Sequence, residues 1–254
     1  MPMRATTVRF SDALWTLVER EAGRDGVSAA QYIRDATIVR TAYTMGQRGD
    51  ADFDEAIARA AARQEEPEAG PPLDGAARRT ALLEAAAAAE DEGRLDALHA
   101  TGLLDSDISP SFDRLARLAS QVLHAPVALV SLVDADRQFF KSCLGMPEPW
   151  ASERGSPLTH SFCQHAIASR EPLIVSDARE HEVLRDNLAI RDMGVIAYAG
   201  IPLIDSGGHA LGTLCVIDSQ PRHWTSHQVQ LLSDIAASVV TEITLAQAVA
   251  DSAD

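Results

Sequence analysis

The chain has 254 residues, of which 46% are hydrophobic and 23% charged, and its formal net charge is −15. This length fits two modest domains with connecting segments, and the composition is typical of a soluble globular protein. The sequence contains no run of eighteen apolar residues and no charged and apolar leader, so we expect no membrane span and no secretory signal. The sparse cysteines lack a Cys-x-x-Cys motif, which argues against a disulfide scaffold or zinc ribbon and favours a cytoplasmic protein with reduced thiols.

The negative charge is unevenly distributed along the chain. Residues 1–50 hold seven arginines and six acidic residues, so they carry a net charge of +1 and the remaining residues −16. A near-neutral, arginine-containing N-terminal segment permits DNA binding. The strongly acidic remainder makes non-specific adhesion to DNA unfavourable.

Residues 1–48 predict a strand followed by two helices. Alternation in residues 6–10 places Thr7 and Arg9 together on one face of the strand. Ser11 is the predicted N-cap of the first helix, and residues 28–31 form a capping box that opens the second. A single short strand cannot pair with itself or complete a core, so this head predicts a homodimer.

The head, with Thr-Val-Arg-Phe-Ser at 7–11 and Val-Ser-Ala-Ala-Gln-Tyr-Ile-Arg-Asp-Ala at 27–36, resembles the ribbon-helix-helix DNA-binding family. The resemblance implies that two chains pair their strands into a ribbon that enters the major groove. It makes Ala5, Thr7 and Arg9 the base-facing residues. It also places the backbone N–H groups of Ser28, Ala29 and Ala30 against a DNA phosphate. A head that only dimerises is the alternative interpretation.

Residues 49–93 predict a linker. This stretch is rich in alanine and acidic residues, is interrupted by a proline-rich segment at 67–72, and has few large apolar side chains. It therefore cannot build a core. The alanine run at 85–89 favours a helix, which we interpret as a spacer.

Residues 94–250 predict an α+β domain with an antiparallel sheet, because helical and strand patterns alternate and some strands are joined by tight turns. The predicted strands are residues 127–133, 137–143, 173–176, 198–204 and 210–217. The predicted helices are residues 112–119, 161–169, 186–192 and 226–249. The first strand is apolar on both faces, so we expect the sheet to be covered on both sides.

Five motifs of this domain follow one another as in the GAF domains of bacterial signalling proteins. They are Gly102–Asp105, Val130–Asp134 with Asp136–Ser142, Ser161–Ile167, Tyr198–Leu203 and Leu211–Asp218. This resemblance covers about 150 residues of the chain. It implies a sensory module with a twisted antiparallel sheet, the two end helices on one face and a pocket on the other. Some members of the family bind a small molecule in that pocket and others only dimerise.

The GAF arrangement predicts which residues line the pocket. They are Phe139 or Phe140, of which alternation allows only one, with His160, Phe162, Cys163, Tyr198 and Thr213. Aromatic and apolar groups with a few hydroxyl, imidazole and thiol groups suit a small, partly apolar ligand. The same side chains could instead simply fill the core. The sequence identifies neither the ligand nor a cofactor.

Cys163 and His165 form the most suggestive chemical pair in the sequence. A thiol at the start of a helix, two residues from a histidine, could react with oxidants or help to hold a metal or haem. On a helix, however, these side chains point about 200° apart, which favours a packing role. His223 and His227 fit a helix-capping segment better than a zinc site. We therefore expect no metal site, no catalytic set and no enzymatic activity.

These interpretations together predict a homodimeric, cytoplasmic, one-component transcriptional regulator. The GAF domain would sense a small molecule or a redox signal and control DNA binding by the head, with the linker helices as the coupling element. The alternative is a non-catalytic GAF scaffold that binds a protein partner and whose head serves only for dimerisation.

Overall fold

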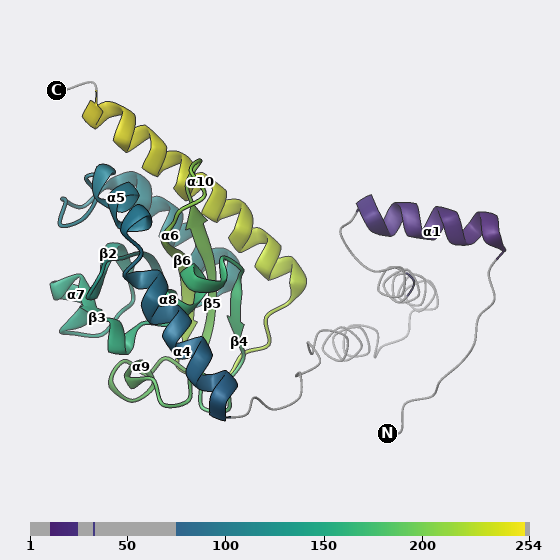
Figure 1. Cartoon of the computed structure of the whole chain (residues 1–254), viewed down its shortest axis with the longest axis horizontal. Coiled ribbons are helices and arrows are strands. Elements are labelled where there is room, and N and C mark those ends of the chain that lie inside the picture. Colours follow the sequence, from purple (N-terminus) through teal and green to yellow (C-terminus); the bar gives the residue numbers. More distant parts are fainter. Residues whose placement is uncertain (1–10, 25–32, 34–74, 252–254) are drawn as a thin grey trace. The chain divides into compact units, whose positions relative to one another are not determined.

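A computed structural model of the chain describes residues 11–24, residue 33 and residues 75–251. The chain divides into two compact units, Met1–Glu66 and Pro67–Asp254. Figure 1 shows the described helices and strands of both units in sequence colours.

The described part of the first unit is dominated by helix α1 (Asp12–Arg24). The backbone N–H of Leu14 donates to the Ser11 hydroxyl at 3.4 Å, so the predicted N-cap is confirmed. Val18 is buried, whereas Leu14 and Leu17 are 44% and 43% exposed. The predicted strand and second helix, with Ala5, Thr7, Arg9, Ser28, Ala29 and Ala30, lie outside the described residues, so the ribbon-helix-helix head stays a prediction.

The described part of the second unit is built on a six-stranded sheet in the order β3-β2-β1-β6-β5-β4. Every neighbouring pair of strands is antiparallel, which confirms the predicted sheet type. The strands are β1 (Val127–Val133), β2 (Arg137–Leu144), β3 (Gly155–Pro157), β4 (Leu173–Val175), β5 (Ala197–Ile204) and β6 (Ala210–Asp218). Only β3 was not predicted, because a three-residue edge strand with a glycine and a proline has no alternation to recognise.

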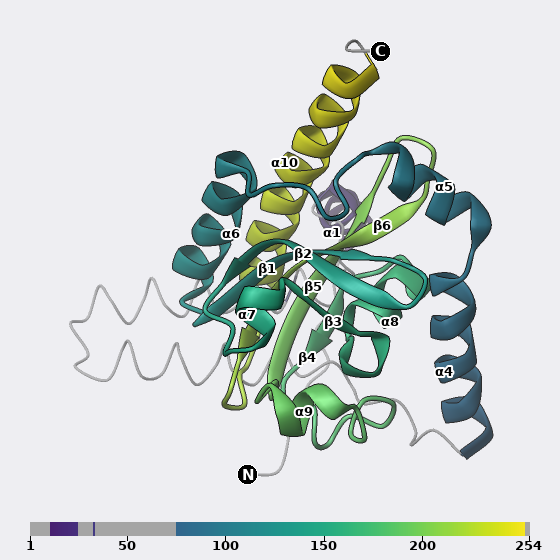
Figure 2. The ribbon, with the colours of Figure 1, turned by 90° about the vertical axis from the view of Figure 1, so that its left-hand side faces the viewer.

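One face of the sheet is covered by α6 (Pro110–Leu123) and α10 (Ser226–Asp251), as Figure 2 shows. The core of this face includes Leu115, Val130, Leu214 and Val239, all buried. The preceding helix α5 (Glu92–Ala100) contributes Leu98 to the same core. The predicted placement of the two end helices on one face is therefore confirmed.

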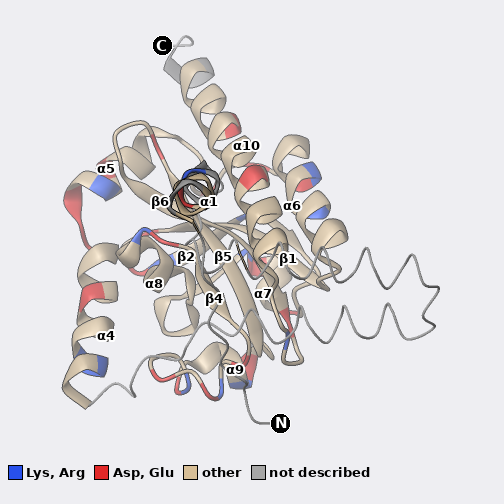
Figure 3. Cartoon of the chain, turned by 90° about the vertical axis from the view of Figure 1, so that its right-hand side faces the viewer, with Lys and Arg blue, Asp and Glu red and all other residues tan. Residues whose placement is uncertain are grey.

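Helix α10 begins with a reciprocal cap. The backbone N–H of Gln228 donates to the Thr225 hydroxyl at 3.1 Å, and the N–H of Thr225 donates to the Gln228 side-chain oxygen at 3.0 Å. This leaves His223 outside the helix, as predicted. By length and composition alone, residues Ser226–Ala248 would suffice to cross a membrane. Figure 3 shows few charges along this helix, but Leu232, Val239 and Ile243 pack in the core of the sheet.

The other face of the sheet carries the remaining helices of this unit that pack near the cavity side. They are α4 (Gly75–Ala89), α7 (Trp150–Glu153), the 3₁₀ turn η1 (Leu158–His160), α8 (Cys163–Ser169) and α9 (Leu188–Asp192). Helix α4 lies in the expected spacer, yet it packs against α8 and buries Ala85 and Ala89. Short alanine side chains allow two helices to approach closely, so α4 has a packing role that its composition concealed.

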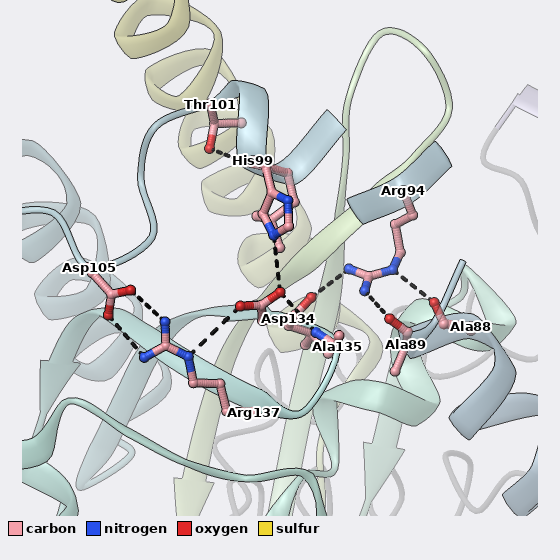
Figure 4. Close-up of polar contacts among 11 residues, drawn as sticks. Ala88, Ala89, Arg94, His99, Thr101, Asp105, Asp134, Ala135 and Arg137 are labelled. Atoms are coloured by element: carbon pink, nitrogen blue, oxygen red, sulfur yellow. Dashed lines mark hydrogen bonds and ion pairs between the residues drawn. The ribbon is translucent and has the colours of Figure 1, made fainter. Parts of the chain in front are cut away.

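Several residues of the GAF motifs fasten the chain before β1 to the turn after it. Arg137 donates two hydrogen bonds to the Asp105 carboxylate, at 2.9 and 2.5 Å (Figure 4). The Asp134 carboxylate lies 3.8 Å from the Arg137 guanidinium and contacts the His99 ring nitrogen at 3.2 Å. Two hydrogen bonds between planar groups fix their relative orientation, so these motif residues have a structural role.

Candidate functional site

A small cavity lies between the sheet and helices α8 and α9. It has a volume of about 20 Å³, which is room for about one water molecule. Known ligand pockets are far larger, at roughly 300–1,000 Å³. The lining residues are Leu129, Gln138, Phe140, Met146, His160, Phe162, Cys163, Ala189, Met193, Val195, Tyr198, Cys215 and Ile217.

The structure brings most of the predicted pocket residues together. Phe140, His160, Phe162, Cys163 and Tyr198 line the cavity, and the Thr213 hydroxyl contacts the Cys163 sulfur. Alternation along β2 separates the two phenylalanines, so Phe139 packs into the core on the opposite face instead. These side chains largely fill the space between them, and binding of a ligand stays a prediction.

Sequence reasoning missed other lining residues. Gln138 and Cys215 each lie two positions from a predicted pocket residue on the same strand, so alternation alone could have placed them on this face. Met146, Met193 and Val195 come from loops, where no periodic pattern exists to reveal their direction.

The sulfur of Cys163 lies at the centre of a group of hydrogen-bond donors. The Thr213 hydroxyl donates to it at 3.1 Å and the Tyr198 hydroxyl at 3.5 Å. The thiol of Cys215 and the hydroxyl of Ser131 lie close enough to affect the ionisation of Cys163 as well. These donors, with Cys215 first, lower the pKa of the Cys163 thiol although burial opposes them. Proximity to Cys163 and burial raise the pKa of Cys215, so Cys163 is the thiol that ionises first.

Tyr198 reaches this centre because Gly200 has no side chain. A Cβ atom added at Gly200 would overlap the Tyr198 phenol, which lies along β5 above this glycine. Gly200 also pairs with Cys215 across the two strands. The phenol ring therefore occupies the space beside Cys215, packed against Phe162 with ring centroids 5.4 Å apart.

A hydrogen-bonded network closes one side of the cavity. The side-chain oxygen of Gln138 accepts hydrogen bonds from Ser161 at 2.9 Å and from Ser131 at 3.4 Å. The amide nitrogen of Gln138 donates to Ser156 at 2.7 Å. All four residues are buried, so a ligand that uses Gln138 has to replace partners already in place.

His160 forms the rim of the cavity. Its ring lies 5.0 Å from that of Trp150, and its Nε2 contacts the Asp192 carboxylate at 3.1 Å. Arg191, and secondarily His160, lower the pKa of Asp192 to about 2. Asp192 is therefore ionised near neutral pH and holds the His160 ring in place over the cavity.

His165 points away from this centre. It lines a separate groove of about 620 Å³ between α4 and α8, with Glu84 and His181. Burial, and secondarily the proximity of His181, lowers the pKa of His165 to about 4. Cys163 therefore lines the small cavity, whereas His165 lines the separate groove. The described part of the chain contains no group of three or more histidine, cysteine or acidic residues placed to hold a metal ion.

Comparisons with known proteins agree with this architecture. The GAF domain family matches residues 107–243. A cyclic di-GMP phosphodiesterase of Pseudomonas aeruginosa is 33% identical over 144 residues, which are 56% of this chain and 24% of that protein. The chain thus spans about a quarter of the length of that relative.

Two solved structures are also similar. The GAF domain of a phosphoenolpyruvate-protein phosphotransferase from Acinetobacter is 19% identical, with a TM-score of 0.47, and the match covers 63% of this chain and 99% of that one. The corresponding domain from Coxiella burnetii is 15% identical, with a TM-score of 0.49, and the match covers 63% of this chain and 95% of that one.

Proposed function

Because the chain belongs to the GAF domain family, we propose that it is a signal-responsive transcriptional regulator in which the GAF domain controls DNA binding by residues 1–48. The GAF domain is the signalling part of the chain. The similarity of residues 7–36 to ribbon-helix-helix proteins supports the DNA-binding part. In this proposal the active species is a homodimer, since the ribbon needs a strand from each of two chains.

The contact between α4 and α8 is the observation that carries this proposal. Helix α8 begins at Cys163 in the cavity, and α4 packs against it with Ala85 and Ala89 buried. In the sequence, α4 is the first described helix after the N-terminal unit. A change in the cavity that displaces α8 therefore also displaces α4, which gives a physical route toward the head.

The signal in this proposal is a small molecule or an oxidant. A ligand larger than water has to open the cavity, and the side chains best able to move are Met146 and Met193, because unbranched methionines adapt their shape at little cost. The ligand would therefore bind a more open state and shift the population toward it. That shift would reach the head through α8 and α4.

The charge distribution supports binding of DNA through the head alone. Residues after 50 carry a net charge of −16 and repel the DNA backbone. In the head, Arg9 is the proposed base reader, since arginine can make two hydrogen bonds to guanine. The exposed Leu14 and Leu17 of α1 suit a surface that a second copy covers.

The test is DNA binding by the full chain. Genomic fragments captured by the protein supply the operator, and fluorescence anisotropy then measures its affinity. Replacement of Arg9 by alanine should weaken operator binding by about 5- to 150-fold and leave the dimer intact. Arg117→Ala, an exposed change on α6, is the matched control and should have no effect. If no fragment is enriched, or if Arg9→Ala binds like the wild type, the proposed DNA contact is wrong.

A second candidate function is a non-catalytic scaffold that binds a protein partner. Leu118 and Val122 of α6 favour it, because they lie one helical turn apart and are 42% and 37% exposed. In this case the full chain would form dimers through the head but retain no DNA fragment. For either function we propose that the chain itself is not an enzyme, and turnover of methionine sulfoxide by the purified protein would contradict this.

A further inference from the structure

Cys163 and Cys215 come from distant parts of the sequence but share one end of the cavity. Cys215 lies two residues after Thr213 on β6, so both side chains point toward α8. Cys163 is the first residue of α8, and its sulfur lies 3.1 Å from the Thr213 hydroxyl. The two thiols are close enough to change each other's pKa. Gly200 pairs with Cys215 across β5 and β6, and the Tyr198 phenol fills the space above this glycine beside the two thiols.

The surroundings of Cys163 suit a thiolate. The hydroxyls of Thr213 and Tyr198 both donate to its sulfur. Ionised sulfur is the nucleophilic form of cysteine, and hydrogen bonds to an anion are stronger than those to a neutral group. Its interaction with Cys163 and its burial raise the pKa of the neighbouring Cys215 thiol. The pair thus contains a nucleophilic thiol and a second thiol that can react with it in a later step.

The size of the cavity limits what can reach this sulfur. Its volume of about 20 Å³ admits a molecule close to water in size. At the rim, His160 and Met193 are only partly buried, so the cavity lies near the surface there. Hydrogen peroxide is little larger than water, whereas glutathione disulfide is a peptide-sized molecule that the closed cavity excludes.

We propose that Cys163 and Cys215 are a buried dithiol that hydrogen peroxide oxidises to a disulfide. In the first step the sulfur of Cys163 attacks one oxygen of the peroxide and the O–O bond breaks. Cys163 becomes a sulfenic acid, and the other oxygen leaves as hydroxide and takes up a proton to form water. In the second step the sulfur of Cys215 attacks the sulfur of Cys163 and the S–O bond breaks. The departing oxygen leaves as a second water with the Cys215 proton, so two thiols have lost two electrons to one peroxide.

Cys143 is a built-in comparison. It lies on β2 and is not among the residues that line the cavity. Burial raises the pKa of the Cys143 thiol to about 11, so this thiol remains protonated near neutral pH. The dithiol reaction therefore distinguishes Cys163 from another partly buried thiol of the same chain.

This inference deepens the proposed function by making the signal an oxidant, and it rests on that function only for the effect on the head, because the reaction itself needs neither DNA nor a bound ligand. The reaction depends on the two thiols and the cavity alone. If the reaction fails, regulation of DNA binding by another signal is still open. If DNA binding fails, the dithiol reaction is still measurable.

The experiment treats the full chain with hydrogen peroxide, blocks remaining thiols with N-ethylmaleimide and maps the digest without reduction by mass spectrometry. The expected product is a peptide pair joined through Cys163 and Cys215, and before N-ethylmaleimide is added the intact mass of the chain should be lower by two hydrogen atoms. Cys143→Ser should give the same product. Cys215→Ser should stop at a sulfenic acid on Cys163, which dimedone traps, and Cys163→Ser should give neither product.

Two further results decide the outcome. N-ethylmaleimide is added under denaturing conditions after the peroxide treatment. The proposal is overturned if it then labels both Cys163 and Cys215 fully. A disulfide that involves Cys143 would overturn it as well. Oxidised glutathione should leave the native chain unmodified, and a rapid mixed disulfide at Cys163 would contradict the size limit. Near-ultraviolet circular dichroism checks that each variant is folded, and the wild-type digest is decisive by itself where a variant is not.

Discussion

The guanidinium of Arg94 donates a hydrogen bond at 2.5 Å to the main-chain carbonyl of Val133, the last residue of β1. The same group donates to the carbonyls of Ala88 and Ala89 at 2.8 and 2.6 Å. One buried side chain thus joins the C-terminal end of α4 to the sheet (Figure 4). Carbonyls at a helix C-terminus lack partners within the helix and carry partial negative charge, so a cation suits them.

Replacement of Arg94 by methionine should therefore destabilise the domain. Methionine fills much of the volume but leaves the three carbonyls without their donor, and a buried acceptor that loses its partner costs about 1–3 kcal/mol. We expect the free energy of unfolding in urea to fall by about 3 kcal/mol in total. Arg117→Met, an exposed change on α6, should leave it unchanged. Equal stability of the two variants would show that Arg94 does not hold α4 in place.

The fit between Tyr198 and Gly200 leads to a second prediction. Gly200→Ala places a Cβ atom where the phenol lies, so it should lower the free energy of unfolding by about 1–3 kcal/mol through overpacking. In a Tyr198→Ala background the space is free and the same change should cost well under 1 kcal/mol. The double-mutant cycle is measured by urea unfolding. Additive effects would mean that the two side chains do not compete for this space.

Patterns with a fixed period account for what the sequence predicted well. The strand predicted at 127–133 is β1, because seven consecutive apolar or small residues between turn signals fit a strand covered on both faces. The Thr225 cap was also predictable, since Thr and Gln three residues apart satisfy each other's backbone groups. Alternation also predicted that only one of Phe139 and Phe140 faces the pocket, whereas Tyr198 and Thr213 were predicted from the resemblance to GAF domains.

What the sequence could not predict depends on contacts between distant segments. Helix α4 looks like a spacer because alanine carries no large apolar side chain, and only the position of α8 shows that Ala85 and Ala89 are buried. The proximity of Cys163 to Cys215 depends likewise on where α8 begins relative to β6. The small size of the cavity is set by how Phe140, Tyr198 and their neighbours pack, which no local pattern reports.

The hydrogen bond from Thr213 predicts the ionisation of Cys163. Thr213→Val keeps the shape but removes a donor to the thiolate, so the pKa of Cys163 should rise toward its ordinary value. A hydrogen bond to a charged group is worth about 1.5–3 kcal/mol, which corresponds to a rise of about 1–2 pH units. Titration of the ultraviolet absorbance of the thiolate measures it. Thr244→Val, an exposed change on α10, should not shift the titration, and an unshifted Thr213→Val would remove Thr213 from the thiol centre.

The groove between α4 and α8 predicts acid sensitivity. The pKa of His165 is lowered to about 4 by burial, whereas an exposed histidine titrates near pH 6.5. Between these values the unfolded chain binds the proton and the folded chain does not, so stability is full above pH 6.5 and is lost as the pH falls toward 4. We expect a loss of about 3 kcal/mol across this window.

Two variants check this assignment by urea unfolding at a series of pH values. His165→Gln should flatten the curve, although burial also lowers the pKa of the neighbouring His181 and leaves part of the slope. His227→Gln, at the exposed start of α10, should reproduce the wild-type curve. An unchanged slope in His165→Gln would assign the acid sensitivity to other groups.

The packing of α4 predicts where the C-terminal unit can be cut. A fragment of residues 67–254 contains the whole second unit and should fold with the near-ultraviolet circular dichroism of the full chain in this region. A fragment of residues 91–254 retains the GAF motifs but lacks α4, so it exposes the α8 surface that Ala85 and Ala89 cover and deprives Arg94 of two carbonyl partners. We expect it to unfold at clearly lower urea concentration, by about 3 kcal/mol or more in free energy, and to bind an apolar dye. The two fragments share the same sheet, so a difference between them reports on α4 alone. If the two fragments were equally stable, α4 would be only a spacer, and the proposed physical route from the cavity toward the N-terminal segment would be wrong.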